Sequence, residues 1–306
     1  MRIAAMAAGA VGGYFGARLA AAGHDMHFIA RGAHLAALRQ NGLKIDSVHG
    51  DLSLKPVNAT DDPARVGPVD VVLFAVKLWD TEAAAEQARP LVGPVTRVIT
   101  LQNGIDSVER MRPILGDAVI GGAAYIATVI AEPGRISQTS PFARLRIGRS
   151  DGRADPQLDA FVKAAQDAGI DIAVPASIET ERWEKFVFLV AMSALTAATR
   201  QPIGSIMADP DTSAWFAEVM REVAAVAKAK GVKLADDFVD QRLTFARTGT
   251  PPGMKASMAH DLERGNRLEL DWLSGRVVTL GRELGVPTPA NEAAYRALKL
   301  WRMGGG

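Results

Sequence analysis

Short apolar runs alternate with amphipathic stretches through the first half of the chain, and this pattern predicts strands separated by helices. Apolar runs of roughly four to eight residues, bounded by polar and glycine-containing segments, are typical of strands buried in a sheet. The predicted strands are Ile3–Met6, Met26–Ala30, Val69–Val76, Arg97–Leu101 and Ala118–Gly121. Because helical patterns lie between several of them, we expect a mostly parallel sheet.

The pattern changes in the second half of the chain. Residues 126–149 contain Glu132-Pro133-Gly134, which indicates strands joined by turns, and a helix over Pro156–Ala168 and a strand over Ile170–Val174 follow. Beyond these the periodicity is almost wholly helical. The predicted helices are Glu179–Thr199, Thr212–Lys230, Asp236–Arg247, Ser257–Leu284 and Asn291–Trp301. The ending Gly304–Gly306 is expected to be a loose tail.

A glycine motif follows the first predicted strand. Ala7-x-Gly9-x-x-Gly12 lies between that strand and an amphipathic run, and a second strand follows at the distance expected of a Rossmann βαβ unit. Glycines there allow a tight turn and a close approach of the pyrophosphate to amides at the helix N-terminus. Ala7 replaces the first glycine, by natural drift or by an engineered change, and its methyl is expected to weaken or displace cofactor binding. The cofactor-binding loop comprises Ala7, Ala8, Gly9, Ala10, Val11 and Gly12.

Three polar residues at predicted strand ends extend this site. Arg31 stands where an NAD enzyme usually has an acidic residue, and an arginine there suits the 2′-phosphate of NADP. Lys77 and Asn103 follow the third and fourth predicted strands, where ligands of such sheets bind. Alone, each has a simpler interpretation: a solvated arginine, a lysine that ends a strand and an Asn-Gly turn. Their shared sheet edge favours a common ligand.

The patterns together predict an α/β protein with a Rossmann-type parallel-sheet domain over residues 1–175 and an all-helical domain over residues 176–306. The composition agrees, because 48% of the 306 residues are hydrophobic. A net charge of +1 argues against binding to nucleic acid or an anionic membrane. The chain has no cysteine, and the spacing of its histidines is not that of metal ligands. The N-terminus does not resemble a signal peptide, so a cytoplasmic location is expected.

The first long predicted helix contains an unusual lysine. Lys185 immediately precedes the apolar run Phe186–Ala198 and shares its helical stripe with Leu189, Met192 and Thr196. Desolvation would lower the pKa of such a lysine, and its ammonium could then deliver a proton to a developing alkoxide. The alternative is a surface ion pair with Glu181, one turn earlier.

Two further residues could complete a site in the helical domain. If Leu268–Leu284 is one helix, Glu269 lies on its apolar stripe and points inward. A buried carboxylate should pair with a cation such as Lys185 or hold a substrate hydroxyl. Ser257 precedes the helical segment Met258–Arg264, where its hydroxyl could cap the helix or help to seat a carboxylate.

The chain resembles the ketopantoate reductases, also called 2-dehydropantoate 2-reductases, over essentially its full length. The matching segments are Gly9-Ala10-Val11-Gly12-Gly13, Ile29-Ala30-Arg31-Gly32, Ala75-Val76-Lys77, Leu101-Gln102-Asn103-Gly104, Trp183-Glu184-Lys185-Phe186, Leu195-Thr196-Ala197, Ser257-Met258 and Leu268-Glu269-Leu270-Asp271. The resemblance implies NADPH as hydride donor and a branched 2-keto acid as substrate. It also implies Lys185 as general acid, Glu269 near the substrate hydroxyl, Ser257 at the substrate carboxylate, and Lys77 and Asn103 along the cleft.

Two positions depart from this family. Its members usually carry asparagines one and two turns after the catalytic lysine, where this chain has Leu189 and Ser193. We expect both residues to contact the substrate, and the loss of amide hydrogen bonds favours a bulkier or less hydroxylated keto acid than ketopantoate. Two other interpretations stay open: an NADP-dependent dehydrogenase that oxidises a hydroxy acid, and a cofactor-binding sensor without turnover. A homodimer through the helical domain is also compatible with the sequence.

Overall fold

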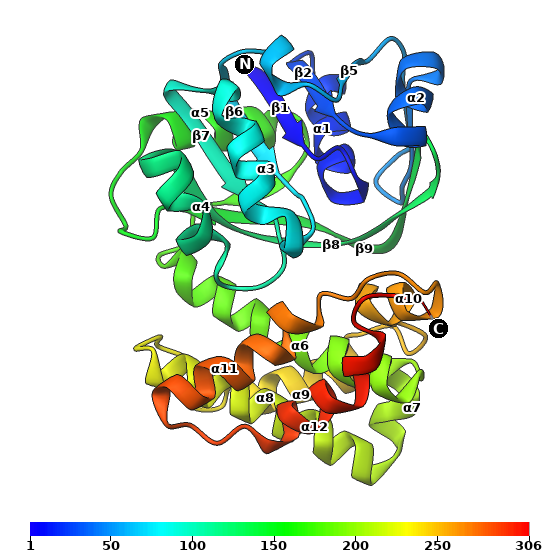
Figure 1. The fold of residues 1–306 in the computed structure, drawn as a ribbon, viewed down its shortest axis with the longest axis vertical. Coiled ribbons are helices and arrows are strands. Elements are labelled where there is room, and N and C mark those ends of the chain that lie inside the picture. The colour runs from blue at the N-terminus through cyan, green and yellow to red at the C-terminus, as the bar shows by residue number, and fades with distance from the viewer. Residues whose placement is uncertain (306) are drawn as a thin grey trace. The chain divides into compact units, whose positions relative to one another are not determined.

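The computed structural model describes residues 1–305, and the chain divides into two compact units, Met1–Glu181 and a second from Arg182 onward (Figure 1). The first unit contains a ten-stranded sheet in the described chain, and the second is helical. The predicted α/β class, with a mostly parallel N-terminal sheet and a helical C-terminal part, is confirmed. No helix within residues 1–305 combines the length and the apolar character that crossing a membrane would need.

The sheet has the strand order β4-β3-β9-β8-β7-β6-β1-β2-β5, with β10 paired to β9. Within residues 1–305, all strand pairs are parallel except β3 with β4 and β8 with β9. The strands are β1 (Arg2–Met6), β2 (Asp25–Ile29), β3 (Leu43–Asp46), β4 (Leu52–Leu54), β5 (Asn58–Thr60), β6 (Val69–Phe74), β7 (Val92–Thr100), β8 (Val119–Glu132), β9 (Arg135–Gly148) and β10 (Asp171–Ala173). The chain runs outward from β1 in both directions, which makes the end of β1 a topological switch point.

Both faces of the central strands are buried, because alternate residues of each strand enter two different hydrophobic clusters. Ile3 and Ala5 of β1 pack with residues of α1, α2 and α5, whereas Ala4 and Met6 pack with residues of α3 and α4. The helices of this unit are α1 (Ala10–Ala21), α2 (Gly32–Asn41), α3 (Thr81–Ala88), α4 (Ser107–Leu115) and α5 (Pro156–Asp167). The continuous apolar runs of the sequence therefore reflect strands covered on both sides.

The predicted elements of this unit differ from the structure in length and number. The strand expected over Ala118–Gly121 extends to Glu132 and forms a long hairpin with β9 through the predicted turn at Pro133-Gly134. Helix α2 and strands β3, β4 and β5 were not predicted. The three strands have three or four residues each, too few for a clear alternation of apolar and polar positions.

The second unit is built around α8, which packs against α7, α9, α11 and α12. In Figure 1, α8, α11 and α12 run side by side within this unit. Helix α6 crosses the division at residue 181. The helices are α6 (Ile178–Thr199), α7 (Ile203–Ala208), α8 (Pro210–Ala229), α9 (Phe238–Thr248), α10 (Ser257–Glu263), α11 (Ser274–Leu284) and α12 (Pro289–Leu298). Short 3-10 turns lie at η1 (Pro63–Arg65), η2 (Leu78–Asp80), η3 (Arg89–Leu91), η4 (Gly116–Ala118), η5 (Leu270–Trp272) and η6 (Lys299–Trp301).

The prediction of one helical run over Ser257–Leu284 was wrong. Helix α10 stops at Glu263, where Gly265 adopts a positive φ of 66° and the Asn266 amide donates to the Asp261 carbonyl at 2.8 Å. Glycine in this left-handed conformation is a common helix stop. The chain then passes through η5 before α11 begins. The prediction failed because the hydrophobic periodicity of the sequence continues past Gly265, the residue at which the helix stops.

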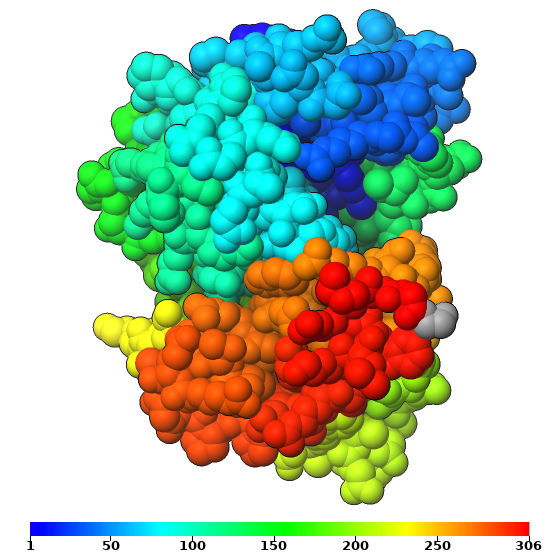
Figure 2. All heavy atoms as spheres, in the orientation of Figure 1, coloured from blue at the N-terminus to red at the C-terminus, as the bar shows by residue number. Residues whose placement is uncertain are grey.

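The prediction of a loose tail was also wrong for the described residues Gly304 and Gly305; Gly306 lies outside the described residues. The Gly305 amide donates to the Gly265 carbonyl at 3.0 Å, and the Leu268 amide donates to the Arg302 carbonyl at 2.9 Å. In Figure 2 the red C-terminal segment lies against the orange residues of the same unit. The end of the chain thus holds the segment that leads to Glu269.

Candidate functional site

The loop after β1 lies at the switch point of the sheet and leads into the N-terminus of α1, a geometry that suits an anion. Gly9 is the N-cap of α1. Because glycine has no side chain that could cap the helix, the amides of the first turn are left available to a ligand. The Ala8 amide donates to the Ile29 carbonyl at 2.7 Å, so the loop is held against the end of β2. The Met6–Ala7 peptide bond, at the position of the replaced glycine, is cis.

The glycines of this loop have different structural roles. A Cβ atom on Gly12 would stand 2.4 Å from the Ala7 carbonyl oxygen. Around a Cβ on Gly9, apart from Gly9 and its two chain neighbours, no atom of residues 1–305 would lie within 4 Å. Gly12 is therefore required by the protein's own backbone. Gly9 instead leaves open space beside the helix N-terminus, as a pyrophosphate seat requires.

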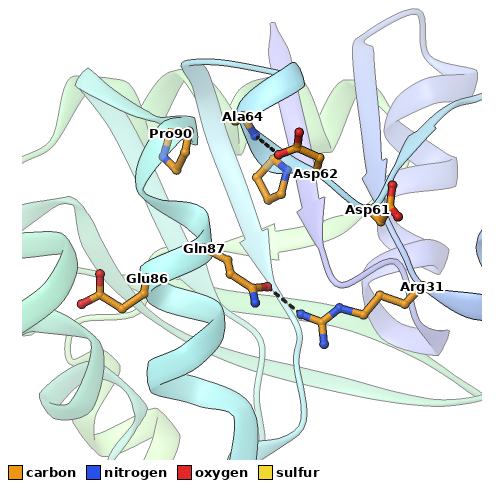
Figure 3. A pocket seen from close by; sticks show the side chains of 8 residues that line it. Arg31, Asp61, Asp62, Ala64, Glu86, Gln87 and Pro90 are labelled. Atoms are coloured by element: carbon orange, nitrogen blue, oxygen red, sulfur yellow. Dashed lines mark hydrogen bonds between the residues drawn. The ribbon is translucent and has the colours of Figure 1, made fainter.

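Arg31 lies in a cavity of about 540 Å³ beyond the end of β2 (Figure 3). Its guanidinium donates to Gln87 Oε1 of α3 at 2.6 Å. Asp61 also lines the cavity and forms an ion pair with Arg39 at 3.2 Å. A cation next to the glycine loop suits a phosphate on the adenosine ribose. The remaining lining residues are Asp62, Pro63, Ala64, Glu86 and Pro90.

Lys77 and Asn103 follow neighbouring strands, β6 and β7, which are parallel. Lys77 is exposed, with Nζ 5.6 Å from the centroid of the Trp79 ring, and Asn103 is half-buried. The sequence did not single out Gln102, whose buried side-chain amide donates to the Val76 carbonyl at 3.1 Å and to Thr81 Oγ1 at 2.8 Å. Gln102 thereby ties together the segments that carry Lys77 and Asn103.

The structure brings Lys185 and Glu269 together in the helical unit. Lys185 lies on α6 and keeps part of its side chain accessible to solvent. Desolvation by the surrounding protein lowers the pKa of its ammonium to about 8; the charge of Glu269 opposes this shift, and that of Arg182 adds to it. The Glu181 carboxylate accepts a hydrogen bond from the Tyr125 hydroxyl at 2.5 Å. Burial, Glu269 and Arg182 thus set the electrostatic environment of Lys185.

Glu269 is buried for a reason other than the predicted one. It precedes η5 and does not belong to a continuous helix, so the stripe that it was expected to share with α11 does not exist. Glu269 is nevertheless buried, with only 6% of its surface exposed to solvent. Its backbone carbonyl accepts from the Trp272 and Leu273 amides at 3.1 Å each. A backbone turn, held from the other side by the C-terminal segment, places the carboxylate near Lys185.

Ser257 does not cap its helix as its residue type suggested. Ala256 is the N-cap of α10, and Ser257 is the exposed first residue of that helix, without a cap hydrogen bond. The Ala256 amide donates to Thr196 Oγ1 of α6 at 3.2 Å. Thr196 is fully buried and donates to the Met192 carbonyl at 2.6 Å. Thr196 therefore ties the start of α10 to the helix that carries Lys185.

Leu189 and Ser193 follow Lys185 on α6 at helical spacing. Leu189 is half-buried, and Ser193 is 1% exposed. Ser193 Oγ is a buried oxygen without a hydrogen-bond partner in the described chain. A buried hydroxyl of this kind is costly unless it binds a water or ligand. No group of three or more His, Cys, Asp or Glu side chains within residues 1–305 could hold a metal ion.

Two family models match the chain. Residues 3–152 match the model described as "Ketopantoate reductase PanE/ApbA", and residues 177–302 match that of its C-terminal part. A 2-dehydropantoate 2-reductase of Mesorhizobium japonicum is 32% identical over 98% of this chain and 97% of its own length.

Solved structures give the same result. A 2-dehydropantoate 2-reductase of Geobacter metallireducens is similar with a TM-score of 0.92, 32% identity, and coverage of 98% of this chain and 99% of its own. A PanE/ApbA family ketopantoate reductase of Ralstonia eutropha JMP134 has a TM-score of 0.88 and 34% identity, and covers 99% of this chain and 98% of its own. The likeness extends over both units.

Proposed function

Because the chain belongs to the ketopantoate reductase family, a family of oxidoreductases, we propose that it uses NADPH to reduce a 2-keto acid to the 2-hydroxy acid. The first substrate to consider is 2-dehydropantoate (ketopantoate), with pantoate as product. The observation that carries this proposal is the position of Lys185 on α6, beside the buried carboxylate of Glu269. Desolvation there lowers the pKa of the Lys185 ammonium to about 8. A group with this pKa is protonated at neutral pH and gives up its proton readily.

The residues of the first unit fit a dinucleotide. The uncapped N-terminus of α1 suits the pyrophosphate, the space next to Gly9 admits it, and Arg31 suits a 2′-phosphate. NADPH, when bound, supplies the hydride that reduces the carbonyl carbon. Ala7, Ala8, Ala10, Val11 and Gly12 form the rest of the loop, and Lys77 and Asn103 contribute from the adjacent strand ends.

The residues of the second unit handle the proton and hold the substrate. Lys185 donates its proton to the carbonyl oxygen as the C–O double bond becomes a single bond, so the hydride and the proton together give the hydroxy acid. Glu269 supports the charged form of Lys185 before the transfer and accepts a hydrogen bond from a substrate hydroxyl. The exposed hydroxyl of Ser257 holds the substrate carboxylate. These groups act by orienting the carbonyl and stabilising the nascent alkoxide.

Leu189 and Ser193 favour a second candidate within the same reaction class. Leu189 places an apolar side chain one turn from Lys185, and the buried Ser193 Oγ has no hydrogen-bond partner among residues 1–305. An apolar pocket gains little from a substrate hydroxyl, which loses hydrogen bonds to water when it enters. The alternative substrate is therefore a 2-keto acid with an apolar side chain.

A matched pair of substrates tests this proposal. Ketopantoate and trimethylpyruvate have the same carbon skeleton and differ by one hydroxyl. We expect NADPH to be oxidised with at least one of them, and NADH to be a poorer donor than NADPH.

Replacing Arg31 with alanine should raise the KM for NADPH about tenfold or more and leave the KM for NADH nearly unchanged, because a charge-assisted contact to the 2′-phosphate contributes roughly 1.5–3 kcal/mol.

Initial rates followed at the nicotinamide absorbance distinguish the outcomes. A preference for ketopantoate supports the pantoate-forming reaction, and a preference for trimethylpyruvate supports the apolar pocket at Leu189. NADPH binding without turnover of any 2-keto or 2-hydroxy acid would refute the reductase and favour a cofactor-binding sensor. Failure to bind either dinucleotide would refute both.

The pH dependence of the reaction should report Lys185. As general acid it must be protonated, so kcat/KM is expected to be maintained below its pKa and to fall as the pH rises through about 8. Replacing Glu269 with glutamine removes the negative charge that raises this pKa, so the falling limb should move to lower pH.

The matched control is Glu218→Gln, which neutralises an exposed carboxylate on α8 and should leave the limb in place. Profiles of kcat/KM between pH 5 and 10 for the wild type and both variants would show whether the falling limb moves only in Glu269→Gln. A limb that stays near its wild-type position in Glu269→Gln would exclude the coupling of the two groups.

A further inference from the structure

His34 connects three segments of the first unit, although the sequence gives it no role beyond that of a lone histidine. It lies in the first turn of α2, three residues after Arg31. Its Nε2 is 3.0 Å from the carbonyl oxygen of Ala8, in the loop before α1, and its Nδ1 accepts a hydrogen bond from the Gly134 amide at 3.1 Å, in the β8–β9 turn. One side chain therefore contacts the cofactor loop and a turn that lies 100 residues further along the chain.

These two contacts determine the protonation state of the imidazole. Because an amide N–H donates to Nδ1, the ring hydrogen must lie on Nε2, where it donates to the Ala8 carbonyl. Protonation would place a second N–H opposite the Gly134 amide and remove that bond. Burial lowers the pKa of His34 from its usual 6.5, and the hydrogen bond to Ala8 only partly opposes this shift. The neutral form is thus favoured at neutral pH.

Both partners of His34 are held rigidly. Ala8 is 1% exposed, and its amide donates to the Ile29 carbonyl. Because His34 binds the Ala8 carbonyl, both backbone polar groups of Ala8 are held in place. Gly134 has a φ of 82°, and a Cβ there would lie 3.2 Å from Ala37 Cβ of α2. The Gly134 carbonyl also accepts from the Lys44 amide at 2.9 Å. The turn therefore provides a fixed point from which the imidazole can position the Ala8 carbonyl.

The charged groups on the surrounding elements are engaged with other partners. The causes of the lowered His34 pKa are burial and the Ala8 bond, with no charged side chain among them. Four sets of charged residues lie on α2 and its N-cap, on the β8–β9 turn and next to β5. Arg31 is bonded to Gln87, Arg39 is paired with Asp61, Asp62 accepts from the Ala64 amide, and Arg135 pairs with both Glu132 and Asp46. The geometry of His34 thus depends on its two backbone partners.

We propose that His34 is a positioning residue for the dinucleotide: its neutral imidazole holds the Ala8 carbonyl, and with it the uncapped start of α1, in register with α2 and Arg31. The proposed pyrophosphate and ribose-phosphate ends of the cofactor site lie on different elements. Arg31 is the N-cap of α2, and His34 lies in the first turn of that helix. This inference rests on the proposed binding of NADP but does not depend on the substrate or on Lys185.

Calorimetric titration with NADP⁺ tests the proposal. His34→Leu removes both hydrogen bonds and should weaken NADP⁺ binding about tenfold. That factor corresponds to the largest net free energy usually found for one buried hydrogen bond. His34→Gln can still place an amide N–H near the position of Nε2 and should recover most of the affinity. In kinetics with the preferred keto acid, His34→Leu should raise the KM for NADPH and leave kcat, the keto-acid KM and the Lys185 limb unchanged. His49→Gln, at an exposed histidine of the same unit, is the control.

The pH dependence of binding provides a second readout. Wild-type affinity for NADP⁺ should fall as the pH drops through the lowered pKa of His34, below 6.5, because the protonated ring loses its bond to Gly134. The difference between wild type and His34→Gln isolates this effect, since the 2′-phosphate titrates in both proteins.

The possible outcomes are distinct. Equal NADP⁺ affinity and an equal pH dependence in wild type, His34→Leu and His34→Gln would overturn the positioning role. A lower thermal stability of His34→Leu with unchanged affinity would also overturn it, by assigning His34 to folding alone. If the wild-type protein binds no NADP⁺, it is the proposed function that fails.

Discussion

Replacing Lys185 with alanine is expected to lower kcat for the preferred keto acid by a factor on the order of 10²–10⁴, the usual contribution of a general acid. The carbonyl oxygen would then lose both the proton and the positive charge that stabilise the nascent alkoxide. NADPH affinity should change little, because the glycine loop and Arg31 belong to the first unit. Single-turnover rates and cofactor titrations of the same preparation would measure both effects.

Lys185→Arg separates the proton from the charge. An arginine keeps a positive charge but does not give up its proton at accessible pH, so kcat should stay low, and the falling limb near pH 8 should disappear. Lys163→Ala, which removes an exposed lysine of α5 paired with Asp167, controls for the loss of a surface charge. Near-wild-type turnover by Lys185→Arg would show that charge alone suffices and would exclude the acid role.

The second large effect is expected from Gly12. In Gly12→Ala the added methyl would lie 2.4 Å from the Ala7 carbonyl oxygen, and that backbone atom cannot move without displacing the whole loop. Overpacking of this kind costs about 1–3 kcal/mol. We expect a lower free energy of unfolding together with loss of measurable NADPH binding, because the displaced loop no longer presents the α1 amides.

Gly9→Ala is the matched comparison. Gly9 has an ordinary φ of −75°, and beyond its two chain neighbours no residue of the described chain comes within 4 Å of the added methyl. Stability should therefore be maintained, whereas NADPH affinity should fall, since the methyl occupies the space assigned to the pyrophosphate. Denaturant unfolding and calorimetry on both variants would test this difference. Wild-type affinity in Gly9→Ala would show that the pyrophosphate lies elsewhere.

The parts of the fold that the sequence predicted are those specified by neighbouring residues. The first strand, the glycine loop, α1 and the second strand lie within thirty residues of one another, and each has its own signal of periodicity or turn chemistry. The buried α6 was likewise recognisable from an apolar pattern nearly all round the helix. Short elements such as β4 and β5, and the break between α10 and α11, were missed because periodicity was weak or misleading there.

The candidate site was predictable only in part, for the same reason. Lys185 stood out because a charge adjoined an apolar helix in the local sequence. Glu269 was selected through an incorrect helix, and its burial results from the turn at η5 and the C-terminal segment. Gln102 and His34 could not be recognised, because their partners are distant in the sequence.

By itself, the sequence determined the class of the fold, the position of the glycine loop after the first strand and the family to which the chain belongs, because these depend on residue types at short, regular spacings. Only the tertiary structure decided that Glu269 lies near Lys185, that Thr196 holds the start of α10, and that His34 links the cofactor loop to the β8–β9 turn. These contacts join residues 26 to 100 positions apart. They arise from how buried backbone groups find hydrogen-bond partners after packing, which no local pattern specifies.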